Sequence, residues 1–151
     1  MTRQRPYDTE ELAELLQLHK LWLAHDPKGK KADLHGANLR GVNLSRLNLS
    51  GADLHGADLS LADLQGTDLT WSNLSGADLI GANMSWARLS YAKMTGADLT
   101  AADLTEAYLS WLNLSGADLT GAELRGVHLT GTKLEGACVY VGGRKMSLVD
   151  K

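Results

Sequence analysis

Hydrophobic residues recur at every fifth position from residue 32 to residue 139, over 22 consecutive units without an insertion or a deletion. The central position of each unit, called i below, is Leu in all but three units, where Met84, Met94 and Val139 replace it. Position i−2 is Ala in 15 of the 22 units. This pattern predicts one large and one small buried side chain in each unit.

A period of five fits neither the helical period of 3.6 nor the strand period of 2. We therefore expect the chain to turn once per unit, with positions i and i−2 pointing inward along a short extended edge. The alternation of a large and a small side chain suits a narrow interior packed at normal density. Leu47 and Leu112 are bulky exceptions at position i−2.

The units Ala52-Asp53-Leu54, Ala77-Asp78-Leu79 and Ser115-Gly116-Ala117-Asp118-Leu119 resemble the pentapeptide repeat family. This resemblance implies an all-β fold, a right-handed quadrilateral parallel β-helix with four units per coil. The solenoid is then expected to span residues 32–139 in about 5.5 coils, with adjacent coils separated by about 4.8 Å.

Residues 1–31 are expected to form an N-terminal arm and a capping α-helix over residues 8–25. Asp8 and Glu11 have capping-box spacing, and Asp26-Pro27 marks the end of the helix. A cap on the first coil is the expected role, because solenoid ends need covering, and docking of a partner is the alternative. The predicted apolar face consists of Leu12, Leu15, Leu16, Leu18, Leu21, Trp22 and Leu23.

Residues 140–151 are expected to be a C-terminal tail or cap. Gly142-Gly143 separates two short β-prone runs, so the tail can fold back and cover the last coil with Met146, Leu148 and Val149. The alternative is an open apolar end at Val139, Tyr140 and Val141 that pairs with a second copy, since exposed sheet edges tend to be covered or paired.

Four units per coil would place residues 20 apart directly above one another. One edge then carries the candidate acidic strip Asp58, Asp78, Asp98 and Asp118, which follows Asn38. Those pentapeptide repeat proteins that resemble DNA and inhibit type II topoisomerases suggest that such a strip imitates a phosphate edge. The alternative, which we favour, is that these side chains bond to nearby turn amides.

The opposite edge carries aromatic and basic residues. Trp71, Tyr91 and Trp111 form one column between Gly51 and Gly131. Exposed Trp, Tyr and Arg are typical of protein interfaces, whereas stacked rings can also serve only to stabilise the coils. The candidate protein-binding face consists of Trp71, Trp86, Arg88, Tyr91, Lys93, Tyr108 and Trp111.

At one corner of the coil, position i+2 is Gly in every coil. We expect a positive φ and type II turns in this column of corners, and not necessarily at the other corners. The column consists of Gly36, Gly56, Gly76, Gly96, Gly116 and Gly136.

No catalytic site is predicted, because the carboxylates repeat with the unit and do not form one tuned pair. Cys138 and His128 fall on different edges, and His35 with His55 lacks a third metal ligand, so no metal or cofactor is expected. The formal charge is −3, and residues 32–139 hold 12 acidic and 6 basic side chains, which disfavours direct nucleic-acid binding.

The chain has no apolar stretch long enough to span a bilayer, and its first residues lack an apolar segment, so neither membrane insertion nor secretion is expected. The single cysteine, Cys138, agrees with a reducing cytoplasm. The sequence thus predicts a non-catalytic cytoplasmic scaffold for an unknown protein partner, with a homodimer through the C-terminal end as one arrangement. A DNA-mimic modulator of gyrase is the alternative.

Overall fold

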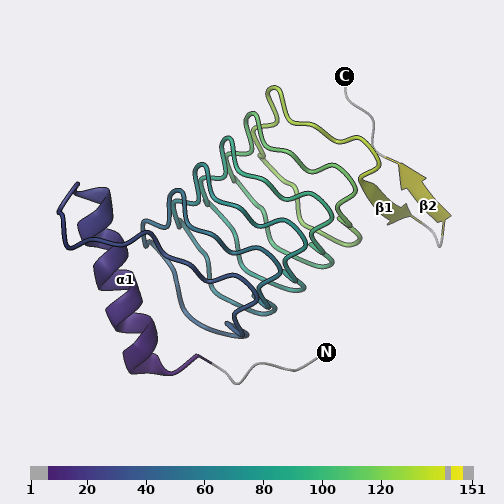
Figure 1. The fold of residues 1–151 in the computed structure, drawn as a ribbon. Coiled ribbons are helices and arrows are strands. Elements are labelled where there is room, and N and C mark those ends of the chain that lie inside the picture. Colours follow the sequence, from purple (N-terminus) through teal and green to yellow (C-terminus); the bar gives the residue numbers. More distant parts are fainter. Residues whose placement is uncertain (1–6, 142–143, 148–151) are drawn as a thin grey trace.

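The structure, a computed structural model, describes residues 7–141 and 144–147. Within these residues, the helix α1 (Thr9–Leu23) lies at one end of a stack of coils, and a hairpin of β1 (Cys138–Val141) and β2 (Arg144–Ser147) lies at the other end (Figure 1). No helix in this part of the chain combines the length and the hydropathy that crossing a bilayer requires.

Helix α1 begins where the sequence predicts. Asp8 is the N-cap residue, and its Oδ1 accepts a hydrogen bond of 2.8 Å from the backbone N–H of Glu10. Acidic residues in the first turn and Lys20 in the last turn both suit the helix dipole. The helix stops two residues before the predicted end, and His25 follows with a φ of 59°.

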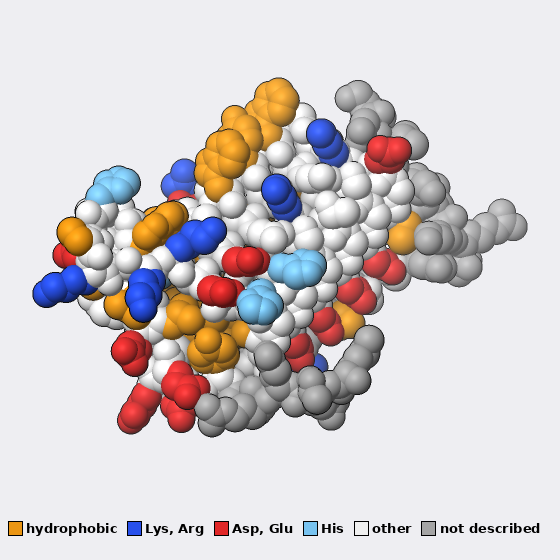
Figure 2. All heavy atoms as spheres, viewed as in Figure 1, with side chains coloured by type: hydrophobic (Ala, Val, Ile, Leu, Met, Phe, Trp, Pro, Cys, Tyr) orange, Lys and Arg blue, Asp and Glu red, His pale blue; other side chains and the backbone are white. Residues whose placement is uncertain are grey.

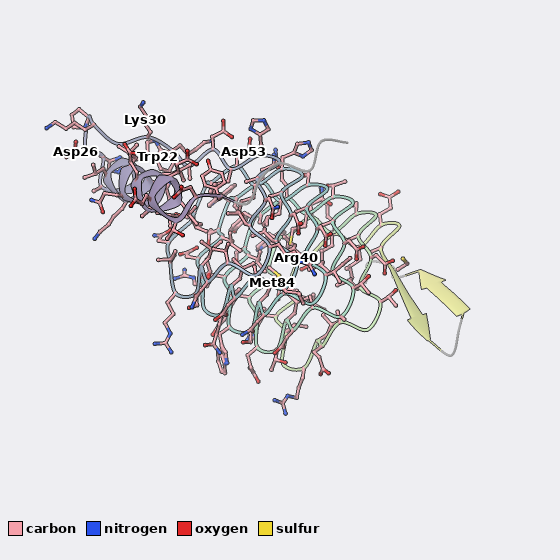
Figure 3. The ribbon with its side chains drawn as sticks, turned by 90° about the horizontal axis from the view of Figure 1, so that it is seen from below. Trp22, Asp26, Lys30, Arg40, Asp53 and Met84 are labelled. Atoms are coloured by element: carbon pink, nitrogen blue, oxygen red, sulfur yellow. The ribbon has the colours of Figure 1, made fainter. Side chains whose placement is uncertain are left out.

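Gly29 allows the chain to double back against the end of α1. A Cβ atom at this position would lie 2.1 Å from the backbone nitrogen of Trp22, which no side chain could tolerate without a backbone shift. The turn brings the chain beside α1 and into the first coil, near Trp22, Asp26 and Lys30 (Figure 3).

The coils are held in a 20-residue register. Parallel bridges join residues 20 apart, from Asp33↔Asp53 to Asp118↔Cys138. Between coils, for example, the N–H of Leu34 donates to the carbonyl of Asp53 at 2.7 Å, and the N–H of Asp53 donates to the carbonyl of Ala32 at 3.0 Å. With a turn after every fifth residue, each coil has four edges.

We number the edges by their columns at position i−1. Edge 1 carries Asp33, Asp53, Asn73, Lys93, Asn113 and Lys133; edge 2 carries Asn38, Asp58, Asp78, Asp98, Asp118 and Cys138; edge 3 carries Asn43, Asp63, Asn83, Asp103 and Glu123; edge 4 carries Asn48, Asp68, Arg88, Tyr108 and His128. Edges 2 and 4 are therefore on opposite sides of the stack.

Every corner from residue 36 to residue 136 has a positive φ at position i+2. The N–H of Ala37 donates to the carbonyl of Leu34 at 3.0 Å, and His35 between them is not in the left-handed region, which defines a type II turn. The expectation for the Gly36 column is confirmed, but the same φ also occurs at corners that lack glycine. The coil imposes it wherever the chain turns.

The interior is filled as the period predicts. The central residues from Leu34 to Leu119 are at most 2% exposed, and each contributes on the order of 2 kcal/mol by burial. Thr67 at position i−2 is also buried, and its hydroxyl donates to the carbonyl of Leu44 at 2.8 Å. Burial of the central residues does not continue to the end of the stack, where Leu129 is 42% exposed.

The tail forms a hairpin, as one of the two sequence interpretations requires. Strands β1 and β2 are antiparallel, with Cys138 opposite Ser147 and Val141 opposite Arg144. The residues of the two tail interpretations lie outside the described part of the chain, Leu148 and Val149 entirely and Val139, Tyr140, Val141 and Met146 with their side chains.

Candidate protein-binding face

Trp71, Tyr91 and Trp111 form a column of parallel rings at the corner between edges 4 and 1, which we call the aromatic ladder. The ring centroids of Trp71 and Tyr91 are 4.5 Å apart with an interplanar angle of 6°, and those of Tyr91 and Trp111 are 6.4 Å apart with an angle of 3°. The predicted vertical register of these three residues is therefore confirmed. Hydrophobic side chains follow one another along the upper edge of the stack in Figure 2.

The ladder residues remain open to solvent although they stack. Trp71 is 67% exposed, Tyr91 44% and Trp111 57%. Stacking of this kind contributes about 0.5–1.5 kcal/mol per pair. It leaves the outer edges of three large rings uncovered in one line.

The backbone at the ladder is unfavourable for its own residues. Trp71 and Tyr91 have a φ of 62° and Trp111 a φ of 61°, in the left-handed region that glycine tolerates best. Trp86, on the corner between edges 3 and 4, shares this conformation with a φ of 62°. The large aromatic residues therefore occupy corners where glycine would relieve strain.

Glycines bound the ladder at both ends, and each one is covered by a tryptophan. The ring of Trp111 overlies Gly131, where an added Cβ would lie 2.5 Å from ring atom Cε3. At the other end, the indole of Trp22 from α1 lies 3.4 Å from the position of an added Cβ on Gly51. The sequence pattern placed Trp22 on the apolar face expected to cap the first coil, but it did not single out the contact with Gly51, the last residue of that coil.

Edge 4 lies between the ladder and Trp86. Arg88 Nη1 lies 3.7 Å from Asp68 Oδ2, and the Tyr108 and His128 rings stack with centroids 4.9 Å apart. Six of the seven predicted face residues thus lie on edge 4 or its two corners, and Lys93 lies on edge 1. We call this set of seven the aromatic-basic face.

The acidic strip lies on edge 2, on the opposite side of the stack. Its aspartates accept hydrogen bonds of 2.9–3.0 Å through Oδ1 from backbone N–H groups two residues later, as with Thr100 on Asp98. The predicted bonding to turn amides is therefore confirmed. A cation also lies on this edge, where Arg40 Nη1 donates to Ser60 Oγ at 2.6 Å.

A buried histidine at the junction of α1 with the coils was not predicted. His19 is 1% exposed, its Nδ1 accepts a hydrogen bond of 3.0 Å from the N–H of Ala32, and its ring stacks on Trp22. Burial lowers its pKa, as does the nearby charge of Lys31, and the carbonyl of Ser50 offsets part of this shift. Nε2 nevertheless lacks a hydrogen-bond partner of normal geometry in the described part of the chain.

Another histidine, His35, contacts an aspartate of edge 1. His35 Nδ1 lies 2.8 Å from Asp33 Oδ1, and this contact raises the pKa of His35 and lowers that of Asp33. Within residues 7–141 and 144–147, no cluster of three or more His, Cys, Asp or Glu side chains could hold a metal ion. Cys138 is a buried free thiol.

Comparison with known proteins identifies the repeat. A family model described as pentapeptide repeats matches residues 30–66, 67–105 and 102–139, with 8 copies. The chain belongs to the pentapeptide repeat family. Proteins of this family are right-handed quadrilateral β-helices, and the fold assignment made from the sequence is correct at this level.

Among solved structures, a trypsin-treated form of QnrB1, a plasmid-mediated fluoroquinolone resistance protein, matches with a TM-score of 0.60 and 24% identity. This match covers 71% of the present chain and 60% of that chain. Its likeness shows the shared fold alone.

Two cyanobacterial pentapeptide repeat proteins also match. HetL from Nostoc sp. is 41% identical over 72% of this chain and 53% of its own, with a TM-score of 0.41. Rfr23 from Cyanothece 51142 is 32% identical over 80% of this chain and 95% of its own, with a TM-score of 0.39. The present chain therefore spans little more than half the length of QnrB1 and HetL. No curated protein sequence matches it.

Proposed function

We propose that this protein is a non-catalytic interaction scaffold, a rigid rod that presents the aromatic-basic face to a protein partner. The observation that carries the proposal is the placement of large exposed aromatic side chains at corners whose backbone favours glycine. Strain held at exposed positions is a basis for inferring a function. Tryptophan, tyrosine and arginine are also the residues that dominate binding energy at protein interfaces.

The proposal includes the organisation of the chain. Residues 1–31 form the arm with its capping helix, residues 32–139 form the solenoid of about 5.5 coils, and residues 140–151 form the tail. Leu12, which is buried, and Leu15 and Leu16, which pack against the core, support the capping role of α1. A cytoplasmic location agrees with a chain that carries one thiol and no disulfide partner.

The test replaces Trp71, Tyr91 and Trp111 together with glycine, which suits the left-handed corners. We expect the variant to stay folded, because relief of strain at about 1 kcal/mol per residue offsets lost stacking of similar size. The matched control is Leu61→Gly, because Leu61 is 57% exposed with a φ of 60° and lies on the corner between edges 2 and 3.

Immobilised wild type, triple variant and control are compared for the proteins that they retain from a cell extract. A partner of the face is retained by wild type and by Leu61→Gly but not by the triple variant. Identical bound sets for all three would reduce the ladder to a stacking support and overturn the proposal. Thermal melts of the same samples show whether loss of binding reflects unfolding.

The second candidate function is modulation of a type II topoisomerase such as gyrase by DNA mimicry. One observation favours it, namely the aspartates aligned on consecutive coils of edge 2. Their Oδ1 atoms are occupied by turn amides, and a net charge of −6 over residues 32–139 is sparse beside duplex DNA. Inhibition of gyrase supercoiling that is lost on Asp78→Lys with Asp98→Lys would favour this candidate over the scaffold.

A further inference from the structure

A groove runs beside α1 on the side of the helix that faces the corner between edges 3 and 4. It has a volume of about 470 Å³. Its lining residues are Ala13, Leu16, Gln17, Lys20 and Leu23 of α1, and Arg46, Leu47 and Asn48 of the first coils. We call it the α1 groove, and we propose that it binds an acidic amphipathic helix of the protein partner.

The residues that α1 contributes have the spacing of a helix-packing surface. They recur at intervals of three or four, which places them in one stripe along the helix. The small Ala13 at one end of the stripe lets a second helix approach closely, and Leu16 and Leu23 offer apolar surface against which its own apolar side chains can pack. This is the arrangement in which an amphipathic helix is recognised by a groove.

The first coil contributes an unusual residue, Leu47, to the lining of the α1 groove. Leu47 is one of two leucines at position i−2, where most units have alanine, and it belongs to the first coil, at the end of the stack where α1 lies. It is half-buried and packs against the core, whereas Leu112, the other leucine at this position, is 1% exposed. Leu47 therefore offers apolar surface to the groove that alanine would not.

The charge of the groove selects the occupant. Lys20 and Arg46 are exposed at the groove, and no acidic residue lines it. A second groove on the other side of α1 has Lys30 and Lys31 as well as three carboxylates, those of Glu11, Glu14 and Asp33. Two cations without a lining carboxylate favour an occupant that carries acidic residues, and charge complementarity of this kind determines specificity more than raw affinity.

The shape of the groove favours a helix over a small apolar ligand. Five of the lining residues are exposed, namely Ala13, Gln17, Lys20, Arg46 and Asn48. Sites for small molecules usually bury most of the ligand surface, which a groove this open cannot do. A helix covers it and retains a solvated outer face.

The groove continues onto the face described above. Arg46 begins the corner column that leads through Gly66 to Trp86, and Asn48 begins the edge 4 column that leads to Arg88. The inference therefore rests on the proposed scaffold function in one respect, that the same partner covers both surfaces. Binding of an isolated helix to the groove does not require the ladder.

The probe is a fluorescein-labelled peptide of about 18 residues, built from Leu, Ala and Glu with leucines at helical spacing, and its counterpart has Lys in place of Glu. Fluorescence anisotropy measures their binding to the full chain. We expect the acidic peptide to bind, the lysine peptide to bind at least about tenfold more weakly, and added salt to weaken the acidic complex.

The test variant is Lys20→Glu with Arg46→Glu, and the matched control is Lys30→Glu with Lys31→Glu, which makes the same change in charge at the second groove. Since exposed ion pairs contribute modestly, we expect at least about fivefold weaker binding for the test variant and less than about twofold for the control. Equal effects of the two variants, equal binding of the two peptides, or no binding of the acidic peptide would overturn the inference.

The ladder triple variant separates this result from the scaffold proposal. It should bind the acidic peptide as wild type does, because the ladder lies on the corner between edges 4 and 1 and contributes no lining residue. Peptide binding together with unchanged extract binding would sustain the groove and remove the ladder as an interface. A loss of peptide binding in the folded triple variant would overturn the assignment to the groove.

Discussion

The residue at position i+2 determines how much strain each turn of the solenoid stores. At most corners it is glycine, which adopts a positive φ without steric cost. At the others the same conformation is imposed on larger residues, including Leu61 and Glu106, at a cost of about 1 kcal/mol or more each. The stack tolerates this cost because hydrogen bonds and buried leucines on both sides keep the chain in its path.

The energetic cost of the positive φ can be measured separately from steric clashes at a glycine whose added Cβ would contact nothing. Gly76 has a φ of +65°, and an added Cβ would meet nothing within 4 Å. We therefore expect Gly76→Val to lower the free energy of unfolding by about 1–2 kcal/mol through strain alone, which corresponds to a fall in Tm of about 2–8 °C. Thermal denaturation followed by circular dichroism checks it.

The comparison for that variant is Gly131→Ala. Here the φ is +68°, and Trp111 also occupies the space of the new methyl group, with Cε3 at 2.5 Å, so the loss of Tm should be larger although the side chain is smaller. An unchanged Tm for Gly76→Val would mean that the corner adapts to a side chain, and the type II assignment there would have to be abandoned.

The sequence predicted the positions that repeat and missed those that do not. The register of 20 followed from the period together with the family resemblance, so the aspartate and ladder columns could be placed before any coordinates. The φ of Trp71 and Tyr91 was not predicted, because left-handed backbone is disfavoured for bulky residues and only the coil imposes it here. The preference of bulky residues for a negative φ therefore failed as a guide at these corners, because the register of the coils imposes a positive φ there.

At the scale of elements, the junction between α1 and the coils depends on a few specific contacts. Gly29 permits the close return of the chain, Trp22 covers Gly51, and His19 joins the helix to Ala32 by a hydrogen bond. The helix was predictable from its cap and its leucines. The role of His19 was not, because its partner Ala32 belongs to the first repeat unit and no periodic pattern links the two.

We expect His19 to make this junction sensitive to acid. Neutral His19 accepts the hydrogen bond from Ala32 through Nδ1, and protonation would remove this acceptor and bury a charge near Lys31. Because its pKa is lowered in the folded state, the unfolded chain binds the proton first as the pH falls. The stabilising contribution is therefore complete above a pH of about 6.5 and declines as the pH falls from there through the lowered pKa.

The test is His19→Gln, because glutamine accepts a hydrogen bond without titrating. We expect the Tm of the wild type to fall from pH 7.5 to pH 5 and the Tm of the variant to fall less. Exchange of the Ala32 amide hydrogen, measured by NMR, should accelerate in the same range in the wild type.

The control is His35→Gln, which should have the opposite effect. Asp33 raises the pKa of His35, so this residue stabilises the fold below a pH of about 6.5 and loses that contribution as the pH rises through the raised pKa. Removing it should deepen the loss of Tm on acidification, if only slightly at so exposed a site. Parallel curves for wild type and His19→Gln would show that His19 is not the group that titrates.

At the scale of the whole molecule, the rod differs from end to end and from side to side. Acidic side chains follow one another along its lower right edge in Figure 2, away from the hydrophobic row along the upper edge. One end is occupied by α1. At the other end Leu124 and Leu134 are half-buried and Leu129 is 42% exposed, although every earlier central residue is buried.

An apolar end of this kind favours association of two copies end to end, because an isologous contact buries the same leucines twice and closes after two subunits. We propose this homodimer and expect a concentration-dependent molar mass approaching twice that of the chain in light scattering coupled to gel filtration. Leu129→Glu should give a monomer, since each carboxylate would be buried against the other. Its Tm, measured on the monomer, should change little, because Leu129 is already partly exposed.

Leu61→Glu is the matched control, because it introduces the same charge at a side chain that is 57% exposed on a lateral corner, away from both ends. It should leave the molar mass unchanged. A wild-type chain that stays monomeric at about 100 μM would rule out a dimer of useful affinity, since a Kd in that range corresponds to only about 5.5 kcal/mol. A dimer that survives Leu129→Glu but is lost on Leu61→Glu would place the contact on the corner between edges 2 and 3, diagonally opposite the aromatic ladder, and would overturn the end-to-end arrangement.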